Sequence, residues 1–149
     1  MILYLDTSAL VKRYFREPYS DEVLSRWKSA TQIVTSFVAY AETMASMYRK
    51  KRDADIADTL IRKAIDSFHQ DWESFIRVEV SDELNGYIDR VVKGYPLRGF
   101  DAIHLASAMV IHERLPEDFV FACFDDRLAR AAQSEGLKTF PLLNTTYDL

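Results

Sequence analysis

The chain has very few of the residues that build disulfide-rich, fibrous or disordered proteins. Its 149 residues include one cysteine, four glycines and four prolines. The single cysteine, Cys123, excludes an internal disulfide framework and any cluster of cysteine metal ligands. So little glycine and proline excludes collagen-like and low-complexity sequence, and 48% hydrophobic residues are enough for an ordinary core. We therefore expect a single domain over residues 1–149.

Long apolar runs are also missing. No stretch reaches the ~20 apolar residues that a membrane-spanning helix needs, and the short apolar run at the N-terminus is interrupted by Asp6. This predicts a soluble protein with no membrane partner, and we expect it in the cytoplasm. The formal net charge of −4 excludes a broadly basic nucleic-acid-binding protein. Any contact with nucleic acid must use local basic patches or metal ions.

Apolar spacing predicts short strands that alternate with amphipathic helices. Strands are expected at 2–5, 32–35, 75–80, 119–124 and 139–142. Helices are expected at 8–15, 20–29, 37–50, 54–68, 82–92, 101–112 and 126–134. Alternation of this kind is typical of α/β proteins, in which helices cover both faces of a mostly parallel sheet. The 101–112 helix is apolar on nearly every side, so we expect it at the centre of the domain.

Four acidic residues stand where a parallel sheet gathers its ligands. Asp6 follows the first strand and Asp125 follows the fourth, so both belong at the carboxyl edge of the sheet. Asp101 opens the central helix, and Glu42 lies within the helix after the second strand. For each aspartate alone, a simpler explanation is a helix N-cap, a position that Asp favours. Glu42 has no basic residue one helical turn away, so a distant arginine would have to compensate its charge if no metal did.

Taken together, these carboxylates would repel one another if they converged. At ~5 Å separation each pair is unfavourable by ~3 kcal/mol at an effective dielectric of ~20, whereas a helix-end interaction contributes nearer ~1 kcal/mol. Oxygen ligands select a hard cation, so the pattern predicts a Mg²⁺ or Mn²⁺ site formed by Asp6, Glu42, Asp101 and Asp125. Such a site can activate water and neutralise the charge that develops on a phosphodiester.

Three segments resemble the signatures of the PIN-domain family. They are DTSAL at 6–10, RGFDAIHLA at 98–106 and FDDRLARAA at 124–132. Glu42 occupies the place of the family's second acid, and the register of the third segment favours Asp125 over Asp126. Within the family, the sequence is most similar to VapC toxins, the toxic partners of toxin–antitoxin pairs. The resemblance covers the whole chain.

This resemblance implies a sheet order of 3-2-1-4-5 and a metal-dependent endoribonuclease. In the family, the equivalents of Asp6, Glu42, Asp101 and Asp125 bind one or two Mg²⁺ or Mn²⁺ ions. Water attacks an RNA phosphodiester and leaves a 5′-phosphate and a 3′-hydroxyl. The implied protein partners are a small VapB-type antitoxin and a second copy of the chain. Two other functions stay open: a PIN nuclease of RNA maturation without an antitoxin, and a non-catalytic PIN binding module.

Three basic residues and one serine are candidates for binding substrate. Arg98 lies three residues before Asp101, where it could clamp a phosphate or pair with one of the acids. Lys12 and Arg13 lie on one side of the first predicted helix, where they could hold RNA or form a solvated face. Ser8 could hydrogen-bond near the metal, or cap a backbone N–H at the helix start.

The remaining features are expected to serve the fold and the assembly. His104 lies in an apolar helix one turn after Asp101, which favours a buried, hydrogen-bonded histidine over a metal ligand or general base. The apolar residues of 40–48 and 56–65 could form the face of a homodimer. The basic block at 49–52 complements the dipole of a helix C-terminus.

Overall fold

The computed structural model describes residues 1–143, so the last six residues of the predicted domain lie outside the described part. The strands are β1 (Ile2–Leu5), β2 (Gln32–Ser36), β3 (Ile76–Val78), β4 (Phe119–Ala122) and β5 (Lys138–Phe140). The α-helices are α1 (Thr7–Leu10), α2 (Ser20–Ser29), α3 (Val38–Ala54), α4 (Asp58–Ser74), α5 (Asn85–Gly94), α6 (Gly99–Arg114) and α7 (Asp126–Ser134). Two short 3₁₀ turns complete the order, η1 (Val11–Arg13) and η2 (Asp82–Leu84).

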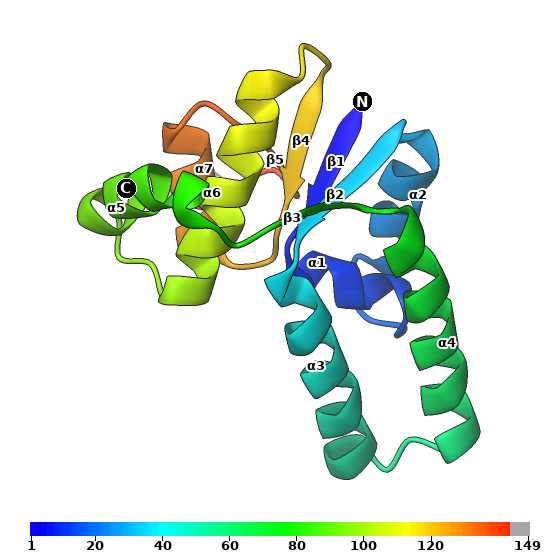
Figure 1. The fold of residues 1–149 in the computed structure, drawn as a ribbon. Coiled ribbons are helices and arrows are strands. Elements are labelled where there is room, and N and C mark those ends of the chain that lie inside the picture. The colour runs from blue at the N-terminus through cyan, green and yellow to red at the C-terminus, as the bar shows by residue number, and fades with distance from the viewer. Residues whose placement is uncertain (144–149) are drawn as a thin grey trace, which may run out of the picture.

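The five strands of residues 1–143 form one parallel sheet in the order β3-β2-β1-β4-β5. The predicted α/β class and sheet order are therefore confirmed. β1 pairs with β2 on one side and with β4 on the other, at the middle of the sheet (Figure 1). The carboxyl ends of β1 and β4 consequently meet at one edge, where the chain passes into α1 and α7.

The sheet separates two apolar cores, because successive side chains of a strand point to opposite faces. Ile2 and Tyr4 of β1 belong to the core beneath α5, α6 and α7. Leu3 and Leu5 belong to the core beneath α1, α2, α3 and α4. All four side chains are fully buried. The uninterrupted apolar run of β1 thus reflects a strand covered on both faces, and the predicted three-layer arrangement is confirmed.

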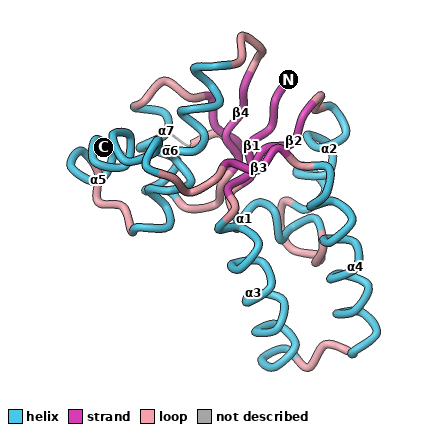
Figure 2. Tube along the Cα trace, viewed as in Figure 1, coloured by secondary structure: helices cyan, strands magenta, loops and turns pink. Residues whose placement is uncertain are grey.

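α6 is the central helix, as its all-round apolar sequence predicts. Eight of its residues are buried, on more than one side of the helix: Ala102, His104, Leu105, Ala106, Ser107, Ala108, Met109 and Val110. In contrast, α3 and α4 form an antiparallel pair that projects beyond the sheet (Figure 2). The N-terminal end of α3 stays beside the carboxyl edge of the sheet, so this helix can deliver a side chain to that edge.

The first predicted helix differs most from the structure. α1 ends at Leu10, and the chain then tightens into the 3₁₀ turn η1. Residues 12–16 therefore do not continue one α-helical face. The predicted 119–124 strand is also too long, because β4 ends at Ala122, where its pairing with Leu5 and Phe140 stops.

The boundary between α3 and α4 lies later than predicted. α3 continues through the basic block at 49–52, whose positive charges suit its C-terminal end. It ends where Asp55 adopts a left-handed backbone with φ of 49°. α4 then begins at Asp58 instead of residue 54 and continues to Ser74. Across residues 1–143, no helix is both long and apolar enough to cross a bilayer.

Candidate active site

Asp6 and Asp125 lie at the carboxyl edge of the sheet, as predicted, and each also caps a helix. Oδ1 of Asp6 accepts a hydrogen bond from the backbone N–H of Ala9 at 3.0 Å. Oδ1 of Asp125 accepts from the backbone N–H of Leu128 at 2.9 Å. Each aspartate can therefore cap a helix and also take part in a binding site, because the cap occupies only one of its two carboxylate oxygens.

All four predicted acids line one cavity of about 260 Å³ at this edge, which we term the acidic cavity. Its lining residues are Asp6, Thr7, Ser8, Glu42, Arg98, Phe100, Asp101, His104 and Asp125. They come from the segment after β1, from α3, from the start of α6 and from the turn before α7. The sheet topology brings them together, since no local segment contains more than one of the four acids.

The negative charge of Glu42 is stabilised by hydrogen bonds from two side chains that the sequence pattern did not indicate as its partners. Oε1 of Glu42 accepts from the Thr7 hydroxyl at 2.7 Å and lies 2.8 Å from Nε2 of His104. Burial alone would raise the pKa of Glu42, but the hydrogen bonds of His104 and Thr7 outweigh it and lower that pKa. The distant arginine expected in the absence of a metal is therefore replaced by a hydroxyl and an imidazole.

The expectation that His104 is buried and hydrogen-bonded is confirmed, but its partner had not been foreseen. The imidazole bonds to Glu42, which lies 62 positions earlier in the sequence. Its position one turn after Asp101 was the available signal that it reaches the site. Thr7 carried no such signal, because its bond to Glu42 spans 35 positions.

Asp6 is the most deeply buried of the four acids. Desolvation raises the pKa of Asp6 to about 6, against the opposing effects of His104, the Ser8 hydroxyl and the Ala9 N–H. Ser8 donates to Oδ1 of Asp6 at 2.7 Å and accepts from the backbone N–H of Phe124 at 2.9 Å. Ser8 thus orients Asp6, and the N–H that it satisfies belongs to the turn after β4 and not to the start of its own helix.

Asp101 lies within the first turn of α6 and does not cap it. α6 begins at Gly99, and its N-cap residue is Arg98. Burial, followed by the negative charge of Asp125, raises the pKa of Asp101, while the positive charge of Arg98 opposes the rise. Arg98 lines the acidic cavity beside Phe100, whose side chain is 58% exposed. A cation and an aromatic ring therefore stand at the rim of the cluster of acids.

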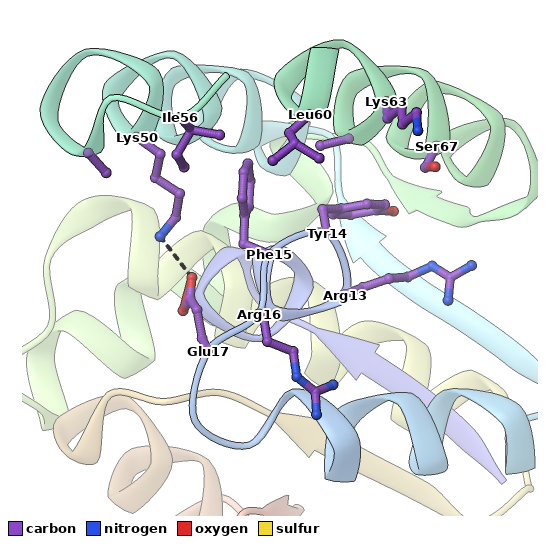
Figure 3. A pocket seen from close by; sticks show the side chains of 12 residues that line it. Arg13, Tyr14, Phe15, Arg16, Glu17, Lys50, Ile56, Leu60, Lys63 and Ser67 are labelled. Carbon is purple, nitrogen blue, oxygen red and sulfur yellow. Dashed lines mark ion pairs between the residues drawn. The ribbon is translucent and has the colours of Figure 1, made fainter. Parts of the chain in front are cut away.

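Lys12 and Arg13 lie outside the acidic cavity. Nζ of Lys12 is 3.3 Å from Oε2 of Glu17. Nε of Arg13 is 2.7 Å from Oδ2 of Asp71 on α4, and Arg13 lines a separate cavity of about 690 Å³ beneath the α3–α4 pair (Figure 3). The structure does not bring these two residues to the four acids, because α1 stops before them. Their role in binding RNA stays a prediction.

The donor set of the acidic cavity suits a hard divalent cation, because it consists of carboxylate oxygens. Asp6, Glu42 and Asp125 each bond protein donors through one oxygen. Among the hydrogen bonds within residues 1–143, none involves the second oxygen of these carboxylates. The four acids are not closed around one position, however. Within residues 1–143, no group of three or more His, Cys, Asp or Glu side chains is arranged so that it could hold a metal ion. The residues fit a cation by their chemistry and not by a closed geometry.

The PIN-domain family model matches residues 3–134, a span that contains all four acids. The chain therefore belongs to the PIN-domain family. Its relatives include ribonuclease VapC46 of Mycobacterium tuberculosis, which is 36% identical over 138 residues, covering 91% of this chain and 93% of the relative. Ribonuclease VapC45 of the same species is 27% identical over 140 residues, covering 94% and 95%. The predicted relationship to VapC proteins is confirmed.

Solved structures share the fold. FitAcB from Neisseria gonorrhoeae superposes with a TM-score of 0.68 at 15% identity, covering 94% of this chain and 96% of that one. VapBC2 from Rickettsia felis, bound to a DNA fragment from its promoter, superposes with a TM-score of 0.61 at 16% identity, covering 93% and 97%. At such identities the likeness concerns the fold alone.

Proposed function

We propose that the chain is a Mg²⁺- or Mn²⁺-dependent endoribonuclease whose active site is the acidic cavity. One observation carries the proposal: four carboxylates from separate segments line a single small cavity. Two of them, Asp6 and Asp101, have pKa values raised by burial, and the charge of Asp125 adds to the rise at Asp101. A non-catalytic binding module gains nothing from carboxylates that repel one another. A bound cation, in contrast, offsets their repulsion. The relatives named as ribonucleases support the same conclusion.

The four acids, Arg98 and Ser8 then each have a definite task. Asp6, Glu42, Asp101 and Asp125 hold the cation through the oxygens that face the cavity. When bound, the cation supplies activation of water and neutralisation of charge on the phosphodiester. Arg98 holds the RNA phosphate at the rim, because a guanidinium matches phosphate oxygens in charge and geometry. Ser8 keeps Asp6 in place through its hydrogen bond to Oδ1.

We further propose that the chain is the toxin of a toxin–antitoxin pair. The similar folds include VapBC2 and a toxin–antitoxin complex from Klebsiella pneumoniae. The expected partner is a small VapB-type antitoxin. Arrest of growth on expression, relieved by the acid-site variant Asp101→Asn, distinguishes the toxin from a nuclease of RNA maturation. Growth that continues during expression of a protein active in vitro would favour the maturation enzyme.

A homodimer through α3 and α4 is the proposed assembly. Tyr40, Tyr48 and Leu60 expose large apolar surfaces on this pair, which projects from the sheet (Figure 2). Apolar side chains gain stability when a partner removes them from water. A second copy of the chain that covers Tyr48 and Leu60 would lie away from the acidic cavity, because Glu42, like Tyr40, is near the N-terminal end of α3.

The experiment that tests the enzymatic proposal is cleavage of a mixed pool of structured and single-stranded RNAs by the purified chain. Mg²⁺, Mn²⁺ and EDTA conditions are compared for the wild type, Asp6→Asn, Asp101→Asn and Asp125→Asn. The matched control is Asp126→Asn, because Asp126 is adjacent to Asp125 but does not line the acidic cavity. We expect cleavage only with the metal, lost in the three site variants and retained in the control.

Two results would contradict the proposal. Cleavage that survives Asp6→Asn and Asp101→Asn would place the activity at another site or in a contaminant. If no RNA in the pool is cut, Mn²⁺ titration of the wild type and of Asp6→Asn decides, since binding that does not depend on Asp6 would favour a non-catalytic binding module.

A further inference from the structure

A buried chain of hydrogen bonds runs from the central strand to the acidic cavity through His104. His104 lies on α6 and is 2% exposed. Its Nδ1 lies 2.9 Å from the hydroxyl of Tyr4 on β1, and its Nε2 lies 2.8 Å from Oε1 of Glu42 on α3. One imidazole therefore joins three elements and uses both of its ring nitrogens.

The direction of these bonds follows from Glu42, because an ionised carboxylate can only accept, so Nε2 of His104 is the donor. The partner of the other ring nitrogen is Tyr4. This side chain is fully buried, and burial raises the pKa of its phenol well above the usual value, so the hydroxyl keeps its proton. When that hydroxyl donates to Nδ1, a neutral His104 carries its own proton on Nε2. A doubly protonated His104 also carries a proton there. In both forms Nε2 donates to Glu42.

Glu42 gains a fixed orientation from this arrangement. The Thr7 hydroxyl donates to the same Oε1 at 2.7 Å, so two donors hold one oxygen. The hydrogen bonds within residues 1–143 leave Oε2 free. Immobilising a glutamate side chain costs up to about 2 kcal/mol of rotamer freedom. In this protein the side chain is already ordered before a cation binds.

We propose that His104 is a positioning residue, which holds the Glu42 carboxylate so that Oε2 faces the cation, and that Tyr4 in turn orients His104. The inference rests on the proposed function, because it requires a divalent cation in the acidic cavity. Removing a group that orients a metal ligand typically weakens metal binding 10–100-fold. A residue that only tied α6 to β1 and α3 would change the stability of the fold without changing the metal affinity of the folded molecules.

The test is a Mn²⁺ titration of the full chain by electron paramagnetic resonance, with thermal unfolding of the metal-free protein in parallel. We expect His104→Leu to weaken Mn²⁺ binding by about 10–100-fold. His104→Gln retains an N–H donor and should recover most of the affinity. The matched control is His112→Leu, because His112 is on the same helix but is exposed and remote from Glu42; it should bind Mn²⁺ like the wild type.

Tyr4→Phe provides a second variant if His104→Leu does not fold. It retains the buried ring and removes only the hydroxyl that orients His104. We expect weaker Mn²⁺ binding than in the wild type, with a smaller loss than for His104→Leu. If neither variant weakens binding by the folded protein, the positioning role is wrong.

A double-mutant cycle shows whether His104 acts through Glu42. In the Glu42→Ala background, His104→Leu should cause no additional loss of Mn²⁺ affinity. Additive losses would overturn the inference and leave the proposed function standing. No Mn²⁺ binding by the wild-type chain would overturn both.

Discussion

The hydroxyl of Ser8 donates to Oδ1 of Asp6 at 2.7 Å while it accepts from the backbone N–H of Phe124 at 2.9 Å. Asp6 and Phe124 belong to the segments that follow β1 and β4, the neighbouring strands at whose ends the acids lie. One small side chain therefore sets both the orientation of a carboxylate and the distance between two turns. These two bonds explain how a serine two residues after the first aspartate supports the arrangement of the acids, while its predicted contact with substrate stays a prediction.

Ser8→Ala should reduce both stability and activity. The substitution leaves the half-buried N–H of Phe124 without its acceptor, and an unsatisfied donor costs up to about 1–3 kcal/mol when it is buried. The free energy of unfolding measured in urea should fall by about that amount, and metal-dependent cleavage should fall with it. Ser25→Ala on the exposed face of α2 is the matched control. Equal stability of Ser8→Ala and the wild type would show that the bridge has no energetic role.

Asp6→Asn should abolish cleavage yet stabilise the metal-free protein. A carboxyl group whose pKa is raised on folding from 3.8 to about 6 destabilises the fold increasingly as the pH rises through that interval, and the effect is complete above it. Two pKa units correspond to about 3 kcal/mol, which is the upper bound of the expected gain at pH 7.5. Asparagine keeps an oxygen for the Ala9 and Ser8 donors and carries no charge.

The pH dependence separates this effect from a general change in packing. Unfolding by urea, in EDTA, should show the stabilisation at pH 7.5 and little of it at pH 4. Saturating Mg²⁺ should stabilise the wild type by binding the folded state only, and should have little effect on Asp6→Asn. A stability difference that is equal at both pH values would refute the assignment to the Asp6 charge.

The sheet and its central helix could be predicted because their signals are carried by consecutive residues. The apolar run at 2–5 is diagnostic of a strand buried on both faces, and the all-round apolar helix at 101–112 can only be central. The positions of Asp6 and Asp125 followed from the rule that parallel strands share a carboxyl edge. The order of the strands came from the family resemblance, because local pattern does not specify which strands pair.

The partners of the acids could not be predicted, because they depend on contacts between distant segments. The bond from His104 to Glu42 joins α6 to α3, and nothing in the spacing of either helix specifies that their faces meet. The predicted helix that carries Lys12 and Arg13 was also wrong in its extent, while their role in binding RNA stays a prediction. The prediction assumed a continuous helix over 8–15, whereas the chain tightens at Val11 into a 3₁₀ turn, and Lys12 and Arg13 pair with Glu17 and Asp71 respectively.

Arg98 should contribute to binding of RNA, whereas Arg13 should contribute to the stability of the fold. Arg98 lines the acidic cavity, where we propose that it binds phosphate, so Arg98→Ala should raise KM by roughly 10- to 100-fold. Arg13 is paired with Asp71, so Arg13→Ala should lower the free energy of unfolding by about 1–3 kcal/mol and leave KM unchanged. Steady-state cleavage and urea unfolding of both variants check this. A raised KM in Arg13→Ala would instead support the predicted role of Arg13 in binding substrate.

The α3–α4 pair should hold two copies of the chain together. Tyr48 and Leu60 are 45% and 58% exposed, and both lie within the apolar segments predicted to form the dimer face. Tyr48→Glu and Leu60→Glu each place a carboxylate in that face, and burying an unpaired charge is strongly unfavourable. Light scattering should show a dimer for the wild type and a monomer for each variant. Val92→Glu, which alters an apolar residue of α5 that is 44% exposed, should remain dimeric. A monomeric wild type would contradict the proposed dimer. A dimer that persists in Tyr48→Glu and Leu60→Glu but dissociates in Val92→Glu would show that the copies meet through a surface other than the α3–α4 pair.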